Sequence, residues 1–239
     1  MKSRIKQMGI LFAILVMVNI AQNGLSNPKT YIYNLLITIP GIVIGLSFHE
    51  FGHAFVSDRL GDPTPRAQGR VTLNPFAHFD PFGFFALIFC GFGWGVPVQI
   101  DPRYYKHPRR DEFLVSIAGV IMNLFVAIVF SYILHFIYRN VPYDNLATGT
   151  LAGTLFNILL QVVIVNVVLM IFNLIPIPPL DGFGIITEIF NLKKTSFYET
   201  FYNNGFPILM ILMIFGIVSK VLNPIVNLVY SLLLQYIIL

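Results

Sequence analysis

Leu46-Ser47-Phe48-His49-Glu50-Phe51-Gly52-His53-Ala54 stands near the end of a long apolar run that begins near Tyr31. If this run is helical, His49 and His53 lie one turn apart on the same face. Two imidazoles with this spacing can bind one metal ion, and Glu50 then stands beside it as a candidate general base. The chain turns polar again at Asp58. The motif is therefore expected close to one end of a membrane-type helix, below the membrane surface.

The composition places the chain in a lipid bilayer. Charged residues make up 11% of the 239 residues, hydrophobic residues make up 56%, and the mean hydropathy is +0.76. A soluble domain carries roughly a quarter charged residues. The length suits one bundle of about six spans of ~20 residues each, without room for a separate soluble domain. We therefore expect residues 1–239 to form a single integral-membrane domain.

Charge and cysteine content exclude several classes of function. The formal net charge of +4 is typical of positive loops held at the cytoplasmic face. No dense basic stripe is present, so nucleic acid is not an expected partner. The single cysteine, Cys90, excludes an internal disulfide and a cysteine-built metal site. Any bound metal must therefore use histidine, aspartate or glutamate.

Six apolar stretches are expected to cross the bilayer as helices, which predicts an all-α polytopic membrane protein. They are residues 9–20, 31–56, 113–138, 154–174, 206–222 and 224–239. The first follows three basic residues and resembles a signal peptide, but no clear Ala-x-Ala cleavage site follows, which favours a retained span. Pro40-Gly41 suggests a kink before the histidines. Residues 205–239 are expected to hold two closing spans joined at Asn223-Pro224.

Residues 82–100 are apolar but too interrupted for an ordinary span, because four glycines and a proline break them. A re-entrant segment or a β-hairpin fits this stretch better. Residues 58–80, with several prolines and glycines, are expected to form an irregular polar loop. With the amino terminus inside, the basic loops 58–80 and 101–112 and the pair Lys193-Lys194 all fall on the cytoplasmic side.

A catalytic zinc site uses three protein ligands and leaves the fourth position for water, so one more ligand is needed. Asp181 is the best candidate, since it follows an apolar span and a proline-rich break that cannot be helical. The alternative is that Asp181 is the N-cap of a following helix. Other aspartates lie in loops with positive neighbours, where a solvated carboxylate is expected; these are Asp58, Asp62, Asp80, Asp101 and Asp144. His49, Glu50 and His53 could likewise merely end a helix at the membrane interface.

These residues give the chain a resemblance to the site-2 protease family of intramembrane zinc proteases (peptidase family M50), in its compact form without PDZ or CBS domains. The resemblance runs from about Ile39 to Leu192, within a catalytic core of about residues 31–192. Its most specific parts are His49-Glu50-Phe51-Gly52-His53 and Asn173-Leu174-Ile175-Pro176-Ile177-Pro178-Pro179-Leu180-Asp181-Gly182. It implies that His49, His53 and Asp181 bind one zinc ion (Zn2+) per chain and that Glu50 is the catalytic base.

The chain departs from the family pattern at two positions. Relatives often have Ala-Gly-Pro-x-x-Asn where this chain has Ala118-Gly119-Val120-Ile121-Met122-Asn123, so the proline is replaced by Val120. Relatives also often carry lysine at the position of Val96. Asn123 is kept, and it is expected either to stabilise the oxyanion or to form a polar contact between helices. Neither change touches a ligand or the base.

A transmembrane substrate hides its carbonyl groups in helical hydrogen bonds, so it must unwind before cleavage. Residues 89–100, which include Gly93, Trp94 and Pro97, could offer a strand edge to the unwound segment, or could only plug the cavity. His78 is expected to stabilise its own turn.

The sequence thus predicts an intramembrane zinc endopeptidase that acts on transmembrane proteins, in the plasma membrane of a prokaryote, with its active site toward the cytoplasm. Two alternatives use the same residues. A metal-ion carrier would transport through His49, His53 and Asp181, and a non-catalytic member would only bind membrane proteins. A regulatory membrane partner and homo-oligomerisation both stay open.

Overall fold

The computed structural model describes the whole chain except residues 1–16, 18–26, 91–94, 148 and 239, and the described part contains helices and no strand. Among these described residues, four helical segments are long and apolar enough to cross a membrane. They are α2 (Pro28–Arg59), α5 (Pro108–Asn140), α6 (Leu151–Asn173) and Ile217–Ile238, which comprises α9 (Ile217–Leu233) and the π-helix η6 (Leu234–Ile238). The chain is therefore an integral membrane protein.

The remaining elements are shorter or more polar. The helices are α3 (Thr64–Ala67), α4 (Pro81–Cys90), α7 (Asp181–Phe190) and α8 (Ser196–Ile214). Single 3-10 turns are η2 (Pro75–Ala77), η3 (Pro102–Tyr104), η4 (Tyr143–Leu146) and η5 (Leu192–Lys194).

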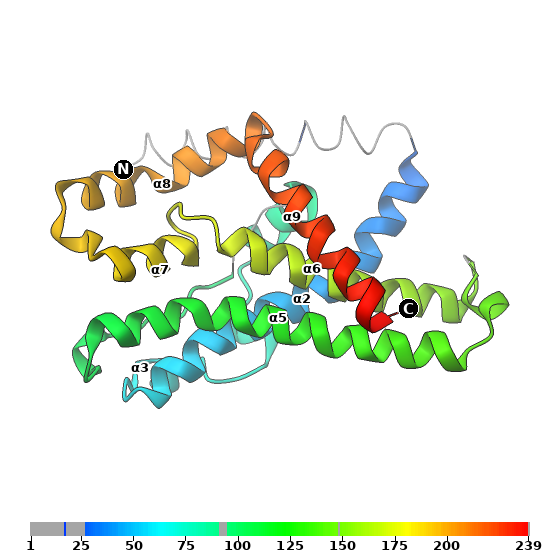
Figure 1. Cartoon of the computed structure of the whole chain (residues 1–239), viewed down its shortest axis with the longest axis horizontal. Coiled ribbons are helices and arrows are strands. Elements are labelled where there is room, and N and C mark those ends of the chain that lie inside the picture. The colour runs from blue at the N-terminus through cyan, green and yellow to red at the C-terminus, as the bar shows by residue number, and fades with distance from the viewer. Residues whose placement is uncertain (1–16, 18–26, 91–94, 148, 239) are drawn as a thin grey trace.

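Helices α2, α5 and α6 pack against one another and form the centre of the molecule (Figure 1). Glycines allow this close packing. A Cβ atom added at Gly41 of α2 would lie 2.9 Å from the carbonyl oxygen of Gln161 in α6. One added at Gly52 would lie 2.9 Å from the carbonyl oxygen of Ala118 in α5. Small residues at helix contacts are how membrane helices approach closely, and here they bring three backbones together around the second half of α2.

Local sequence explains where these helices begin. The side chain of Asn27 accepts a hydrogen bond from the N–H of Thr30, and Pro28 occupies the first position of α2. The hydroxyl of Thr150 accepts from the N–H of Gly153 at the start of α6. Helix α2 continues through Pro40 to Arg59. The predicted spans 31–56, 113–138 and 154–174 are therefore confirmed as long helices.

The prediction for the carboxyl-terminal spans was wrong in its boundary. The chain turns at Gly216, whose φ of +67° is a left-handed conformation that ends α8, and Pro224 lies inside α9. A proline within a helix removes one backbone hydrogen bond, which a membrane helix tolerates. Of the two closing segments, only the one that contains α9 has the composition of a span. The predicted span at residues 9–20 lies outside the described residues.

The interrupted stretch 82–100 begins as helix α4 and, after residues that are not described, continues from Gly95 to Ile100 without regular structure. A β-hairpin is therefore not seen in the part of this stretch that the structure describes. The polar loop 58–80 contains the short turns α3 and η2 where the sequence predicted irregular structure.

Candidate metal centre

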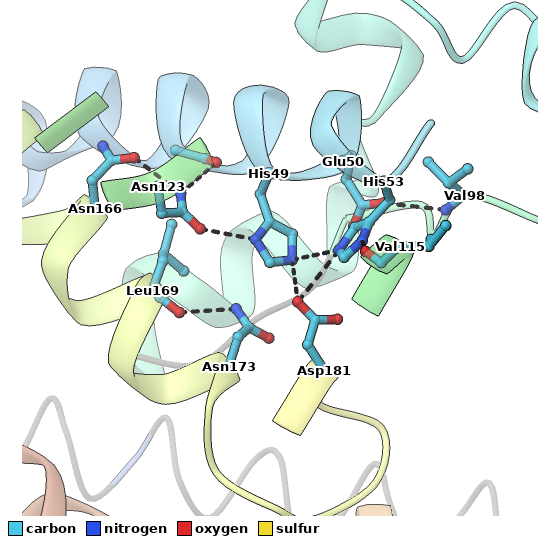
Figure 2. Close-up of polar contacts among 11 residues, drawn as sticks. His49, Glu50, His53, Val98, Val115, Asn123, Asn166, Leu169, Asn173 and Asp181 are labelled. Carbon is cyan, nitrogen blue, oxygen red and sulfur yellow. Dashed lines mark hydrogen bonds and ion pairs between the residues drawn. The ribbon is translucent and has the colours of Figure 1, made fainter. Parts of the chain in front are cut away.

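Helix α2 places His49 and His53 one turn apart, as their spacing predicts, and both rings point to one spot (Figure 2). The Nε2 atoms of the two rings lie 3.1 Å apart. Both side chains are largely buried, at 8% and 12% relative exposure. Two ring nitrogens at this distance, facing each other inside the protein, need a positive charge between them, either a proton or a metal ion.

Asp181 completes this cluster from the other side. The chain breaks after α6, passes through Pro176–Pro179 and starts α7 at Asp181. The Oδ2 atom of Asp181 lies 3.3 Å from Nε2 of His49 and 3.3 Å from Nε2 of His53. Leu180, not Asp181, is the N-cap of α7, and no side chain caps this end. The N-cap alternative for Asp181 is therefore wrong.

Hydrogen bonds fix how each imidazole faces the cluster. Nδ1 of His53 lies 2.7 Å from the carbonyl oxygen of Val115, which can only accept, so Nδ1 carries the proton. Nδ1 of His49 lies 2.8 Å from Oδ1 of Asn123. The Asn123 amide nitrogen donates to the carbonyl oxygen of Gly45, which identifies Oδ1 as the acceptor that faces His49. In the neutral rings, both Nε2 lone pairs therefore point at the carboxylate oxygen.

This donor set fits a zinc ion. Two imidazole lone pairs and a carboxylate oxygen converge, and Oδ2 of Asp181 is buried without a hydrogen-bond partner. Ligand atoms at the usual ~2.0–2.1 Å from zinc in a tetrahedron lie about 3.3 Å from one another. The three separations here are 3.1, 3.3 and 3.3 Å. In the part of the chain that the structure describes, no other group of three such residues lies close enough to bind a metal.

Asn123 belongs to a buried chain of amides that links three helices. Its amide nitrogen donates to Gly45 in α2 at 3.0 Å and to Oδ1 of Asn166 in α6 at 3.0 Å. Asn166 in turn donates to the carbonyl oxygen of Val162. Because both amide hydrogens of Asn123 are used, none remains for an oxyanion. Of the two roles expected for Asn123, its contacts are those of a polar link between helices, and the link ends on a candidate ligand.

Glu50 lies beside the cluster and faces segment 95–101, which contains no helix or strand. Its Oε2 atom accepts a hydrogen bond of 3.1 Å from the N–H of Val98 (Figure 2). Two more backbone bonds hold this segment, from Val96 to the carbonyl oxygen of His78 and from Asp101 to the carboxylate of Asp62, each at 2.8 Å. Gly95 is buried against Glu50, and Pro97 is exposed. Gly93 and Trp94 lie outside the described residues.

Two residues around the cluster carried no expectation from the sequence. Gly119 of α5 faces the ligands, and a Cβ atom there would lie 2.5 Å from Nε2 of His53 and 2.6 Å from Cε1 of His49. Because glycine has only a hydrogen atom in place of a side chain, the two imidazole rings can occupy this space. Asn166 supports Asn123 from α6. Gly119 stands within the family pattern described above but carried no assigned role, and the only signal for Asn166 was an asparagine inside an apolar span.

Asp62 corrects a further expectation. The sequence predicted a solvated loop carboxylate, but Asp62 is 0% exposed. It accepts hydrogen bonds from the Ser57 hydroxyl and from the N–H groups of Thr64 and Asp101. Burial alone would raise the pKa of this carboxyl group, but the hydrogen bonds outweigh burial and hold the pKa below its usual value. Asp62 therefore ties the end of α2 to the segment that covers Glu50.

Two more of these loop aspartates are paired rather than freely solvated, and their side chains are 8% exposed at Asp58 and 20% exposed at Asp101. Asp58 and Asp101 form ion pairs with the exposed Arg66 and Arg103. His78 is buried at 1% exposure, and its Nε2 atom lies 2.8 Å from the carbonyl oxygen of Thr72, which agrees with its expected role in a turn.

Proteins similar to this chain in sequence include ones named as zinc metalloproteases, in agreement with a metal site formed by His49, His53 and Asp181. The model of peptidase family M50 matches residues 37–150 and 141–216. The chain is 36% identical over 201 residues to "Putative zinc metalloprotease YwhC" of Bacillus subtilis (strain 168), which covers 82% of this chain and 90% of that protein. It is 28% identical over 217 residues to "Putative zinc metalloprotease Rip2" of Mycolicibacterium smegmatis, which covers 85% of this chain and 79% of that protein. No solved structure gives a significant match.

Proposed function

The chain belongs to peptidase family M50, a family of zinc metalloproteases, and from this membership we propose that it cuts peptide bonds in or near transmembrane segments of other membrane proteins. The observation that carries the proposal is the convergence of His49, His53 and Asp181 beside Glu50. Helix α2 supplies His49, Glu50 and His53, and Asp181 follows the break after α6.

His49, His53 and Asp181 would hold the ion, and Asn123 and the Val115 carbonyl would keep the two rings in the correct tautomer and orientation. A bound zinc ion supplies Lewis-acid activation of water and of the scissile carbonyl group. Glu50 accepts the proton of the attacking water and passes it to the leaving amine as the C–N bond breaks. The N–H of Val98 holds one oxygen of Glu50, which leaves Oε1 to carry the proton.

The depth of the cluster supports cleavage inside the membrane. His49 and His53 lie in a helix long and apolar enough to span a bilayer. The end of α2, the start of α5 and the end of α6 all lie toward the same side of the bundle (Figure 1). The basic loops on this side support a cytoplasmic position by the positive-inside rule. We accordingly assign the protein to the plasma membrane of a bacterium, with residues 1–239 as one peptidase domain.

Segment 95–100 is the proposed docking site for an unwound substrate. Its side chains alternate between less and more exposed, as in an extended chain, and its N–H groups at Val96 and Val98 are both bonded toward the protein. In an extended chain, the N–H and C=O groups of successive residues point to alternate edges, so the opposite edge offers the C=O of Pro97 and the N–H and C=O of Gln99, while Pro97 has no N–H to donate. Both of these side chains are exposed. A substrate strand added at this edge would run past Glu50.

The test is cleavage of a transmembrane peptide by purified full-length protein in liposomes. Glu50→Gln should keep its zinc and lose at least about a thousandfold in cleavage rate, within the range for a general base. Glu199→Gln, which removes an exposed carboxylate in α8, is the matched control and should cleave as the wild type does.

The same preparation separates the two other candidate functions. Zinc uptake into liposomes, unaffected by Glu50→Gln, would indicate a metal-ion carrier. Tight binding of the peptide with no cleavage by the zinc-loaded wild type would indicate a non-catalytic binding protein. Cleavage by Glu50→Gln at the wild-type rate would show that Glu50 is not the base.

A further inference from the structure

Helix α9 carries a row of exposed polar side chains although it belongs to a candidate membrane span. The row consists of Lys220, Asn223, Asn227 and Ser231, all of them exposed. Their spacing of three and four residues puts them on one face of the helix. Polar groups inside a membrane span are costly in hydrocarbon and usually face protein or water.

The row points away from the part of the chain that the structure describes. The buried side chains of α9 are Val218, Leu222, Val226 and Leu233, which pack into the apolar core. At 100° per residue, the centres of this buried face and of the polar row lie about 140° apart around the helix. A third face, with Val221 and Leu228 at 58% and 59% exposure, is apolar and suited to lipid. The row is thus distinct from both the core face and the lipid face.

No other helix within the described part of the chain offers a hydrogen-bond partner to the side chains of this row. Ser231 donates to the carbonyl oxygen of Leu228 in its own helix, but Asn223, Asn227 and Lys220 form no side-chain hydrogen bond or ion pair within the described part of the chain. Lipid tails offer no hydrogen-bond partner either, and an unpaired amide in an apolar medium costs several kcal/mol. A partner with donors and acceptors at the same depth would remove this cost.

We propose that the partner is a second copy of this chain, bound through α9. An asparagine amide is both donor and acceptor, so the same residue of a second copy satisfies it. All copies share one orientation in the membrane, so a two-fold dimer must place its α9 helices parallel, with Asn223 facing Asn223 and Asn227 facing Asn227. The two Lys220 ammonium groups repel each other, so the contact centres on the two asparagines.

The apolar run at residues 9–20 of the same chain is the other candidate occupant. It carries a single polar side chain, Asn19, and cannot satisfy a row of three or four polar groups. A second copy matches the row residue for residue.

Cysteine cross-linking in native membranes tests the dimer. Cys90 is the only cysteine and is first replaced in Cys90→Ser. In that background, Asn223→Cys and Asn227→Cys should each form a disulfide-linked dimer on oxidation with copper phenanthroline. Ile225→Cys, which is exposed on the apolar face of the same helix, is the matched control and should stay monomeric.

A second measurement guards against chance collisions. The double variant Asn223→Leu/Asn227→Leu should weaken dimerisation about tenfold in detergent, the loss expected for two interhelical amide pairs, while still binding zinc. Equal cross-linking of Ile225→Cys, or an unchanged dimer in the double variant, would overturn the proposal. A disulfide within one chain in Asn19→Cys/Asn227→Cys, without dimers from Asn227→Cys, would assign the row to residues 9–20 instead.

Discussion

Nδ1 of His49 lies 2.8 Å from Oδ1 of Asn123, so a residue of α5 determines which nitrogen of a residue in α2 faces Asp181. Asn123 is itself held by Gly45 and Asn166, so the orientation of the ring depends on all three central helices. The metal cluster is thereby coupled to the packing of the bundle. A ligand whose second nitrogen is bonded keeps its ring in place without the metal, which favours metal binding.

Asn123→Leu, which keeps the branched shape and removes the acceptor, should lower zinc affinity about 10- to 100-fold. The measurement is chelator competition in detergent, with the absorption spectrum of the cobalt-substituted protein as a report on ligand geometry. Asn123→Asp keeps an acceptor for Nδ1 of His49 and should retain more affinity than Asn123→Leu. Wild-type affinity in Asn123→Leu would remove Asn123 from the support of the site.

Gly119→Ala should abolish tight zinc binding although alanine favours helix more than glycine does. The added Cβ atom would lie 2.5 Å from Nε2 of His53, so the rings must move apart. The thermal stability of the metal-free protein should fall little, because the helix itself gains propensity. Ile121→Ala, on an exposed position of α5, is the control and should bind zinc normally. Normal zinc binding by Gly119→Ala would mean that the ligands lie elsewhere.

Asp62→Asn should change how stability depends on pH. The pKa of Asp62 is lowered in the folded protein, so below about pH 4 the unfolded chain binds more protons than the folded one. The stabilisation by Asp62 is therefore complete above the unfolded pKa of about 3.9 and is lost as the pH falls through the folded value. Asp62→Asn does not titrate, so its unfolding temperature should fall less steeply on acidification.

The same variant should be less stable than the wild type at neutral pH by about 1–3 kcal/mol, since a buried charged acceptor of three hydrogen bonds is lost. Asp144→Asn, in an exposed loop position, should match the wild type at every pH. Parallel pH curves for Asp62→Asn and the wild type would contradict the role assigned to Asp62.

The sequence was sufficient where the determinants are local. The one-turn spacing of His49 and His53 follows from helical period alone, and the long apolar runs around them predict three of the four spanning segments. Asp181 could be selected because a proline-rich break before it excludes a helix. The sequence alone allowed Asp181 to be either a metal ligand or the N-cap of the following helix. The position of its carboxylate beside both histidine rings decided between these two roles.

Features that depend on how helices cross could not be read from the sequence. Gly119 and Asn166 matter because α5 and α6 pass α2 at particular positions, and no pattern within one helix encodes that crossing. The burial of Asp62 depends on Asp101, which is distant in sequence. The closing turn was misplaced because Pro224 is the stronger breaker in water, whereas Gly216 adopts the left-handed conformation that ends the helix.

The zinc content of purified Asp181→Ala tests the central claim most directly. The wild type and Glu50→Gln should each bind one zinc ion per chain, and Asp144→Ala should do the same. Asp181→Ala should bind zinc more than about a hundredfold more weakly, a loss beyond the range for residues that only orient a ligand. One tightly bound zinc ion per chain in Asp181→Ala would contradict a site formed by His49, His53 and Asp181.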